Sequence, residues 1–251
     1  MRLENKVAIV TGAAQGLGEA VVKRFVEEGA RVVATDINEE KLKKAMSAYG
    51  DKVLPVGQDV SKEEDWKNVV AAAVKKFGKL NIIVNNAAIM SMKNVLDVGT
   101  DQFVNVFKVN CLSVMLSTKY AAAEMEKAGG GSIVNIDSIG GLTSGDADGG
   151  DAAYSASKGA TRALTKHIAF QLAPKGIRCN TIHPGGIMTE MLKTVYNATP
   201  ALWDRAAEMS PLAPHTSDPS DIANGVLYLA SDEARTVTGA ELVIDCGYMT
   251  K

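Results

Sequence analysis

Tyr154 and Lys158 are the side chains whose types and spacing most directly offer chemistry. The segment Tyr-Ser-Ala-Ser-Lys is predicted to open a helix, where a separation of four residues places both side chains on one face, one turn apart. A phenol ionises near pH ~10 and is a poor base at neutral pH, but a neighbouring ammonium favours the phenolate. Taken alone, such a pair is more often an ordinary feature of a helix surface.

A serine upstream gives this pair a chemical setting. Ser138 follows the apolar run Ser132–Ile136, which predicts a buried strand, so its hydroxyl is expected to meet Tyr154 above the end of a sheet. The three side chains suit hydride transfer, in which a nicotinamide carries the hydride and the protein moves one proton. In this interpretation Ser138 holds the substrate oxygen and Tyr154 is the acid/base. Lys158 favours the ionised phenol and holds the nicotinamide ribose.

A glycine-rich segment, Thr11–Gly18, follows the first predicted strand and precedes an amphipathic stretch. Glycines in a strand–turn–helix connection allow a tight turn and a close backbone approach to a pyrophosphate, which then lies over the helix N-terminus. The spacing is not the common Gly-x-Gly-x-x-Gly, and a turn without a ligand is the alternative. The residues predicted to contact a cofactor here are Gly12, Gln15, Gly16, Leu17 and Gly18.

The second predicted strand ends at Asp36. A carboxylate at this place can accept hydrogen bonds from both ribose hydroxyls, and it repels a 2′-phosphate. Neither Gln15 nor Ile37 supplies a positive charge for such a phosphate. The sequence therefore predicts NAD as the cofactor, unless Asp36 merely caps the helix expected after it.

Polar residues also follow the next two strands. Asp59 and Val60 come after the third, and Asn85-Asn86-Ala87-Ala88 comes after the fourth. The carboxyl ends of parallel strands converge on the crevice in which a dinucleotide lies, so Asp59, Val60, Asn86 and Ala87 are predicted cofactor contacts. The two asparagines could equally form a turn without a ligand.

The elements that must position these residues alternate regularly. Seven apolar runs are separated by amphipathic stretches with helical periodicity, with no linker between them. This order predicts one domain over 1–251, an α/β, doubly wound, Rossmann-like parallel sheet of about seven strands with helices on both faces. The segment Thr189–Thr216 fits no strand and is predicted to be a partly helical substrate lid. The runs are Val7–Val10, Arg31–Thr35, Val53–Val56, Ile82–Val84, Ser132–Ile136, Arg178–Ile182 and Leu242–Ile244. The stretches are Glu19–Glu28, Glu39–Tyr49, Glu63–Phe77, Gln102–Glu126, Ala153–Leu172 and Asp221–Ala230.

Composition narrows the class of protein. The formal net charge is −2, with 46% hydrophobic and 22% charged residues, so no basic field indicates a nucleic-acid or membrane partner. Cysteine and histidine never cluster, so we expect neither a metal site nor a disulfide framework. Neither a signal peptide nor a membrane span is predicted, and a cytoplasmic location is the expectation.

Read together, these motifs resemble those of the short-chain dehydrogenase/reductase family over nearly all 251 residues. Thr11–Gly18 resembles the family's Thr-Gly-x-x-x-Gly-x-Gly loop, Asn85–Ala88 its Asn-Asn-Ala-Gly motif, and Tyr154–Lys158 its Tyr-x-x-x-Lys motif. The resemblance implies Ser138 as the active-site serine and Asn110 as a catalytic asparagine that holds a proton-relay water. It also implies a loop that closes on the nicotinamide amide, formed by Pro184, Gly185, Ile187 and Thr189.

The chain departs from the family pattern at three places. Ala88 replaces the usual glycine of Asn-Asn-Ala-Gly, and Cys246 stands where the family often has glycine. The separation of Ser138 from Tyr154 is longer than usual, through the acidic segment Gly145–Asp151. That segment borders the expected substrate opening, where its acidity could select substrates, or it is a solvated insertion without consequence.

Several stretches are similar to bacterial hydroxysteroid and cyclic secondary alcohol dehydrogenases, which implies NAD-linked oxidation of a hydroxysteroid or a similar cyclic apolar alcohol. A sugar dehydrogenase, a short-chain secondary alcohol dehydrogenase and a 3-oxoacyl reductase are alternatives, as is a non-catalytic NAD-binding regulator. The resemblance further implies a homotetramer, or a homodimer, assembled through the helices at Gln102–Glu126 and Ala153–Leu172.

Overall fold

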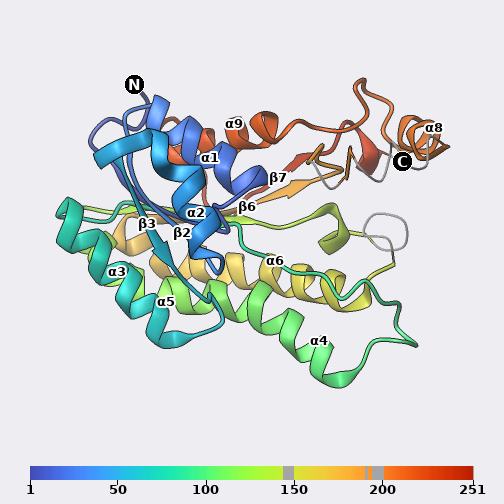
Figure 1. Cartoon of the computed structure of the whole chain (residues 1–251), viewed down its shortest axis with the longest axis horizontal. Coiled ribbons are helices and arrows are strands. Elements are labelled where there is room, and N and C mark those ends of the chain that lie inside the picture. Colours follow the sequence, from blue (N-terminus) through green and yellow to red (C-terminus); the bar gives the residue numbers. More distant parts are fainter. Residues whose placement is uncertain (144–149, 190–191, 194–200, 251) are drawn as a thin grey trace.

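A seven-stranded parallel sheet forms the centre of the molecule (Figure 1). The computed structural model describes residues 1–143, 150–189, 192–193 and 201–250. The strand order is β3-β2-β1-β4-β5-β6-β7, so the chain changes direction across the sheet between β1 and β4. The strands are β1 (Val7–Thr11), β2 (Arg31–Asp36), β3 (Val53–Gly57), β4 (Ile82–Asn85), β5 (Gly131–Ile136), β6 (Ile177–Pro184) and β7 (Glu241–Ile244).

The central strands read as continuous apolar runs because helices cover both of their faces. Every residue of β1 is buried, and Ile9 pairs in register with Val33 on one side and Ile83 on the other. Strands buried on both faces cannot alternate polar with apolar residues. The fold class predicted from these runs is confirmed, with every strand in its predicted place and extended by no more than two residues at an end.

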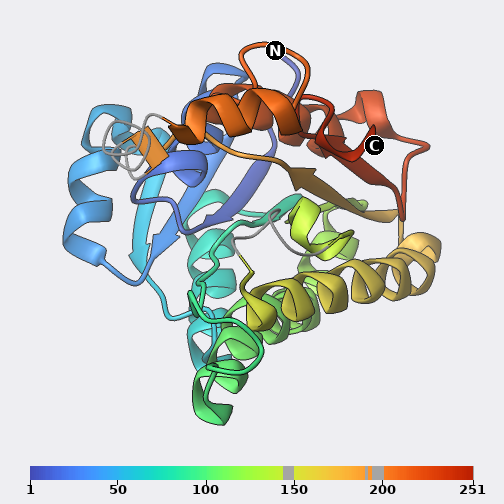
Figure 2. The ribbon, with the colours of Figure 1, turned by 90° about the vertical axis from the view of Figure 1, so that its right-hand side faces the viewer.

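Two helical layers enclose the sheet, as the end-on view in Figure 2 shows. Each layer buries its own apolar cluster, one around Phe25 and the other around Trp66. The Phe25 cluster includes residues of α1 (Gly16–Glu27), α2 (Glu39–Met46) and α9 (Pro219–Ala230). The Trp66 cluster includes residues of α3 (Glu63–Phe77), α5 (Ser113–Lys127) and α6 (Ala152–Leu172).

The single helix predicted at Gln102–Glu126 is interrupted, and in this respect the prediction was wrong. The structure has α4 (Thr100–Phe107), then a π-helical turn over Lys108–Leu112, and then α5. A π turn inserts one residue into the helical ladder, and such turns often occur at functional sites. Here the widened turn contains Asn110, which is 3% exposed.

The remaining helical segments are short. They are η1 (Ser47–Lys52), η3 (Ile139–Gly141), η5 (Ala173–Lys175), α8 (Ala201–Met209), η6 (Asp232–Ala234) and η7 (Tyr248–Thr250). The predicted lid at 189–216 contains α8, which lies at one end of the molecule (Figure 1), while residues 190–191 and 194–200 of that segment lie outside the described residues.

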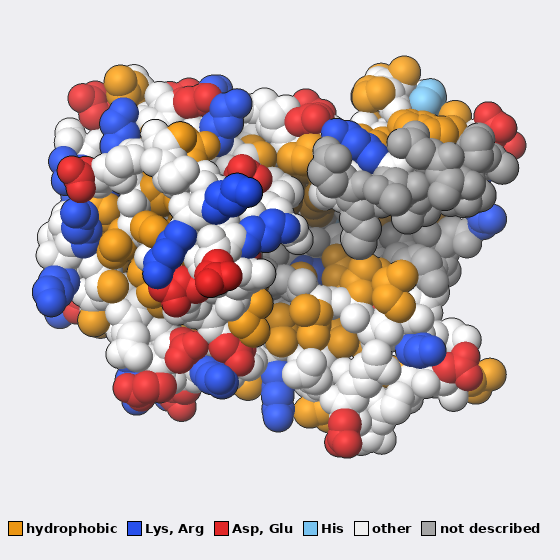
Figure 3. All heavy atoms as spheres, in the orientation of Figure 1, with side chains coloured by type: hydrophobic (Ala, Val, Ile, Leu, Met, Phe, Trp, Pro, Cys, Tyr) orange, Lys and Arg blue, Asp and Glu red, His pale blue; other side chains and the backbone are white. Residues whose placement is uncertain are grey.

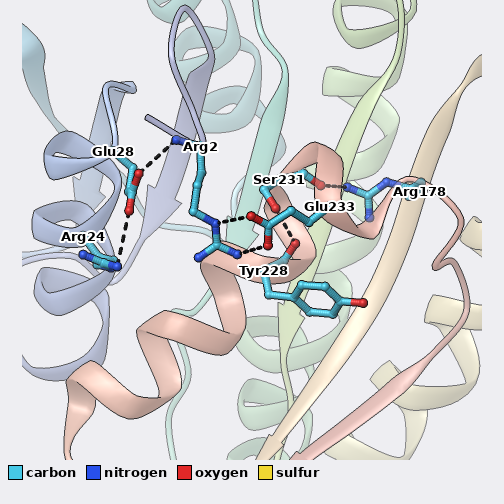
Figure 4. A network of polar contacts seen from close by, with 7 residues as sticks. All are labelled: Arg2, Arg24, Glu28, Arg178, Tyr228, Ser231 and Glu233. Carbon is cyan, nitrogen blue, oxygen red and sulfur yellow. Dashed lines mark hydrogen bonds and ion pairs between the residues drawn. The ribbon is translucent and has the colours of Figure 1, made fainter.

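The N-terminal segment is tied to α1 and to η6 by a polar network (Figure 4). The Arg2 guanidinium donates to both carboxylate oxygens of Glu233, and the Arg2 backbone N–H donates to Glu28 at 2.9 Å. Glu28 in turn pairs with Arg24 at 3.3 Å. These side chains are partly exposed, so their ion pairs contribute little to the free energy of folding. Their effect is to hold the N-terminal segment in place.

No helix in the described ranges is both long and apolar enough to cross a membrane. Within the same ranges, no group of three or more His, Cys, Asp or Glu side chains is arranged to hold a metal ion. The cysteines are unpaired.

Candidate active site

A cleft of about 1290 Å³ opens beside the carboxyl ends of β1, β2, β3 and β4. It lies where the strand order changes direction, which is the usual ligand site of an open parallel sheet. Most of the predicted cofactor contacts line it, namely Gly12, Gln15, Gly16, Leu17, Asp36, Ile37, Asp59, Val60, Asn86, Ala87 and Thr189. The catalytic candidates are not part of this lining and are described below.

The glycine-rich loop is shaped for a close approach to a ligand. Gly12 and Gly16 have φ values of +65° and +60°, in the left-handed region that favours glycine. A Cβ on Gly18 would lie 2.2 Å from the Gly12 carbonyl oxygen, so α1 can pack against the loop only without a side chain there. Gln15 precedes α1 and makes no capping bond through its side chain, which leaves the first N–H groups of the helix available to an anion. The loop therefore fits a pyrophosphate.

Thr11 and Asn86 join this loop to the segment after β4. The Asn86 amide donates to the carbonyl oxygens of Thr11 and Gly12 at 2.8 and 3.1 Å. The Thr11 hydroxyl oxygen accepts from the backbone N–H groups of Asn86 and Ala87, both at 3.0 Å. Asn86 thus fixes the wall of the cleft, and Thr11 is a structural partner that was not singled out from the sequence.

Asp36 is oriented by two backbone donors. Its Oδ2 accepts from the Ala14 N–H at 3.1 Å, and its Oδ1 accepts from the Asn38 N–H at 2.9 Å. A carboxylate has about four lone-pair positions, so two remain for a ribose. The side chain that caps α2 is Asn38, which accepts from the Lys41 N–H at 3.0 Å. The alternative that Asp36 merely caps this helix is therefore wrong.

Two lysines of the α2 helix, Lys41 and Lys44, also line the cleft. Lys41 donates to the Gln15 side-chain oxygen, which places its ammonium beside the glycine-rich loop. Lys41 lies five residues after Asp36 and returns to the cleft along α2, so it supplies a positive charge that neither Gln15 nor Ile37 offers.

Asp59 is held ionised at the end of β3. Its Oδ1 accepts from the backbone N–H and the hydroxyl of Ser61 at 3.0 and 2.7 Å, and Lys62 lies 3.5 Å from Oδ2. Burial raises the pKa of Asp59, but the Ser61 bonds and the Lys62 charge outweigh it, so the net pKa lies below the ordinary value. The preceding Gln58 also lines the cleft, and both polar atoms of its amide are buried without a partner in the described chain.

Tyr154 and Lys158 stand one turn apart in α6. The Lys158 ammonium lies 5.4 Å from the centre of the Tyr154 ring and donates to the Ile136 carbonyl oxygen at 2.6 Å. Lys158 is 3% exposed, whereas Tyr154 is half-buried. The lysine is therefore fixed between the end of β5 and the phenol.

Ser138 lies two residues beyond the carbonyl that Lys158 contacts. Its hydroxyl oxygen accepts from the Gly140 N–H at 3.0 Å, which leaves the hydroxyl hydrogen free to donate. Its carbonyl oxygen is 3.0 Å from the Nδ1 of His183, a buried side chain. The described hydrogen bonds include none between the Ser138 and Tyr154 hydroxyls.

Asn110 connects the π turn to both halves of the site. Its Oδ1 accepts from the Ile89 N–H and its amide donates to the Ile89 carbonyl oxygen, each at 2.9 Å. The same amide donates to the Ser157 hydroxyl at 3.0 Å. Asn110 therefore positions the segment after β4 and the residue next to Lys158, while the relay water stays a prediction.

Asp151 belongs to the site in a way the sequence did not indicate. It is 1% exposed and precedes α6, where its Oδ1 accepts from the Tyr154 N–H at 3.0 Å. The same carboxylate accepts from the N–H and hydroxyl of Ser91, both at 2.6 Å, and from the Met92 N–H at 2.7 Å. A solvated Asp151 is therefore excluded, while residues 144–149 of the acidic segment lie outside the described chain.

The predicted nicotinamide loop follows β6. A Cβ on Gly185 would lie 2.9 Å from the Asp245 Cα, so this glycine permits close packing of the two chain segments after β6 and β7. Ile187 forms an isolated bridge with Ser217. Of the four predicted loop residues, Pro184, Gly185 and Ile187 are not part of the cleft lining, and Thr189 is.

The sequence is similar to those of known proteins of one family. The sequence matches a family model described as enoyl-(acyl carrier protein) reductase over residues 12–249. It is 40% identical over 250 residues to 2,5-dichloro-2,5-cyclohexadiene-1,4-diol dehydrogenase of Sphingobium indicum, covering 98% of this chain and 97% of the relative. It is 39% identical over 251 residues to 3beta-hydroxysteroid dehydrogenase 2 of Eggerthella lenta, covering 98% and 95%.

A solved structure agrees with this assignment. A crystal structure from Burkholderia xenovorans, assigned to the short-chain dehydrogenases/reductases, superposes with a TM-score of 0.92 at 33% identity and covers 100% of this chain and 98% of that chain. The match of fold, sequence length and motif order leads to one conclusion: this chain is an oxidoreductase of the short-chain dehydrogenase/reductase family.

Proposed function

We propose that this protein is an NAD-dependent dehydrogenase that oxidises a secondary alcohol of a hydroxysteroid or a similar cyclic apolar compound, with Tyr154 as the acid/base. The observation that carries the proposal is the buried Lys158 ammonium, 5.4 Å from the centre of the Tyr154 ring and fixed by the Ile136 carbonyl. A positive charge held at this place favours the phenolate, which can accept a proton from an alcohol.

Ser138, Tyr154 and Lys158 each have one role in the reaction. A bound nicotinamide supplies the hydride acceptor. The Ser138 hydroxyl, whose oxygen already accepts from Gly140, donates its hydrogen to the substrate oxygen, on which negative charge develops. Tyr154 takes the hydroxyl proton, and Lys158 stabilises the charge that the phenol carries before this step.

The preference for NAD rests on Asp36. Its carboxylate lines the cleft with two lone-pair positions left for the adenosine ribose, and its charge repels a 2′-phosphate. Lys41 lines the same cleft and attracts a 2′-phosphate, so it opposes this preference. Asp36 has the larger effect on the cofactor preference because two backbone N–H groups hold it in place, whereas Lys41 is an exposed side chain bonded to Gln15.

The substrate class rests on the relatives and on the surface beside the cleft. The two named relatives act on a cyclic diol and on a hydroxysteroid, by their names. Ile89, Met90 and Met92 are 36%, 39% and 77% exposed in the segment that follows the cleft wall. Figure 3 shows hydrophobic side chains gathered on this side of the molecule between α8 and α4. Methionine adapts readily to the shape of an apolar ligand.

The test is NADH formation with a panel of hydroxysteroids, cyclic alcohols, sugars and short-chain secondary alcohols. An enoyl thioester with NADH or NADPH joins the panel because of the description of the matching family model. We expect turnover with cyclic apolar alcohols and NAD, and its loss in Tyr154→Phe. Tyr228→Phe, which removes a hydroxyl from α9, is the matched control and should keep full activity.

Two results would overturn this proposal. Turnover that survives in Tyr154→Phe excludes this tyrosine as the acid/base. Tight NADH binding without turnover on any member of the panel indicates a non-catalytic NAD-binding regulator instead.

We also infer that the protein forms a homotetramer or a homodimer through α4, α5 and α6. Val104, Met115 and Phe170, one on each of these helices, are 43%, 38% and 88% exposed, which leaves apolar surface available for a subunit contact. Light scattering during size-exclusion chromatography measures the mass, and a monomer at micromolar concentration would contradict the inference.

A further inference from the structure

Asp137 is a buried carboxylate that the proposed chemistry does not use. It stands between Ile136, whose carbonyl accepts from Lys158, and Ser138, and it is 2% exposed. Its Oδ1 accepts from the Ser138 N–H at 3.0 Å, while its Oδ2 is buried without a hydrogen-bond partner in the described chain. Buried charges are normally paired, so an unpartnered carboxylate oxygen at this place requires an explanation.

The carboxylate faces the side chain of Lys158 across a single glycine. A Cβ on Gly141 would lie 3.0 Å from Asp137 Oδ1 and also 3.0 Å from Lys158 Cβ. Asp137 also directly follows Ile136, whose carbonyl oxygen accepts from the Lys158 ammonium at 2.6 Å, so its charge is near enough to act on that ammonium. The lysine donates its one described hydrogen bond to Ile136.

We infer that Asp137 is a positioning residue whose negative charge partly offsets the Lys158 ammonium, and so sets the pH range in which Tyr154 can take a proton from the substrate. The inference rests on the proposed function, because it acts through the Lys158–Tyr154 pair. Asp137 itself touches neither the phenol nor the substrate in this scheme.

The other ionisable groups around Asp137 leave Lys158 as its main counter-charge. On α6, Arg162 is paired with Glu241 of β7 at 2.9 Å, and Lys166 is paired with the same carboxylate at 2.8 Å. On β6, burial lowers the pKa of His183, whose ring nitrogens contact the Thr181 hydroxyl and the Ser138 carbonyl, so this ring stays neutral. In the π turn, burial raises the pKa of the Cys111 thiol, which likewise stays uncharged.

The charge of Asp137 changes in the neutral range. Burial raises its pKa to about 7, against the opposing effects of Lys158 and of the Ser138 N–H. At lower pH the carboxyl is neutral and the ammonium acts on Tyr154 alone. At higher pH the negative carboxylate offsets part of the effect of the ammonium on Tyr154. The phenol then loses its proton less readily than it would beside a neutral residue.

Asp137→Asn removes the charge but keeps the shape of the side chain, since the amide oxygen can still accept from the Ser138 N–H. In this variant we expect the midpoint of the pH profile of kcat/KM for alcohol oxidation to move to lower pH by about one unit, with a similar plateau for kcat. Asp232→Asn, an exposed carboxylate paired with Lys6, is the matched control and should leave the midpoint unchanged.

A second readout does not depend on turnover. The ultraviolet absorbance of phenolate, recorded during a pH titration without substrate, reports Tyr154 when the titration of Tyr154→Phe is subtracted. The Tyr154 transition should also occur at lower pH in Asp137→Asn. Asp137→Ser, a smaller uncharged side chain, should shift it in the same direction, which covers the case in which the amide perturbs folding.

The outcomes separate this inference from the proposed function. Unchanged midpoints in both Asp137 variants, together with an inactive Tyr154→Phe, overturn the role of Asp137 and leave the proposed function standing. An active Tyr154→Phe overturns the proposed function itself. A lower kcat at every pH with no shift of the midpoint assigns Asp137 a purely structural role and also overturns the inference.

Discussion

The Asn110 amide donates to the Ser157 hydroxyl at 3.0 Å, and Ser157 directly precedes Lys158. Because the same side chain both accepts from and donates to the backbone of Ile89, it connects the cleft wall, the π turn and α6. The one Asn110 side chain makes all three of these hydrogen bonds. Its conformation therefore fixes the position of the segment after β4 relative to α6.

Replacing this residue should affect both folding and turnover. In Asn110→Ala the N–H and carbonyl of Ile89 lose their partner, so we expect a loss of roughly 2–3 kcal/mol in the free energy of unfolding and a lower kcat. Chemical denaturation and steady-state kinetics measure the two effects. Gln102→Ala, which removes a bond to the Ser91 carbonyl at 2.9 Å, is a milder control in the same region. An Asn110→Ala enzyme that keeps its free energy of unfolding would show that the hydrogen bonds of Asn110 to Ile89 and Ser157 do not stabilise the fold.

Asp36 and Lys41 should act on cofactor choice in opposite directions. Asp36→Asn removes the charge and keeps one acceptor oxygen for the backbone, so the ratio of kcat/KM for NAD over NADP should fall by at least about 10-fold. Lys41→Gln removes the nearby positive charge, so the same ratio should rise. The kinetics of both variants with both cofactors provide the check, and a shift of the same sign in both would contradict this assignment.

Gly18 should tolerate no side chain. A Cβ there would meet the Gly12 carbonyl oxygen at 2.2 Å and the Asn86 amide nitrogen at 2.7 Å, and the Gly12 backbone cannot rotate out of the way. Gly18→Ala is expected to lower the free energy of unfolding by roughly 2–4 kcal/mol and to weaken NADH binding, as measured by denaturation and fluorescence titration. Gly99→Ala, which meets nothing within 4 Å, is the control. Equal stability of the two variants would refute the packing argument.

Asp137 should also make the stability of the fold depend on pH. Its pKa is raised from 3.8 to about 7 in the folded protein, so below pH 3.8 the carboxyl is neutral in both states and costs nothing. Between pH 3.8 and pH 7 the unfolded chain ionises this carboxyl while the folded protein keeps it neutral, so the folded state loses about 4 kcal/mol relative to a neutral residue, and the loss stays constant above pH 7. The difference in unfolding free energy between wild type and Asp137→Asn should therefore grow from pH 4 to about pH 7 and then level off. A constant difference would exclude the raised pKa.

The sheet could be predicted from the sequence because its central strands are covered on both faces. Such strands read as apolar runs that periodicity and β-branched content identify without tertiary information. The cleft followed from the same logic, since polar residues after parallel strands must meet at one edge. The predicted contacts at Asp36 and Asp59 lie together there for this reason.

The features that escaped prediction depend on contacts between distant segments. Asp151 bonds to Ser91, 60 residues away, so nothing in its acidic neighbourhood indicated burial. The π turn has the same composition as the helices around it and shows itself only in the hydrogen-bond ladder. The charge on Lys41 reaches the cleft only because α2 folds back toward Gln15.

The Asp151 carboxylate has a consequence for attempts to change the substrate range. Its Oδ2 accepts from the backbone N–H groups of Ser91 and Met92, and its Oδ1 accepts from the N–H of Tyr154, so the Ser91–Met92 segment and the start of α6 are held together. A substitution that shifts the Ser91–Met92 segment would displace Tyr154 along with it. Redesign for a bulkier alcohol should therefore leave the contacts of Asp151 with Ser91 and Tyr154 in place.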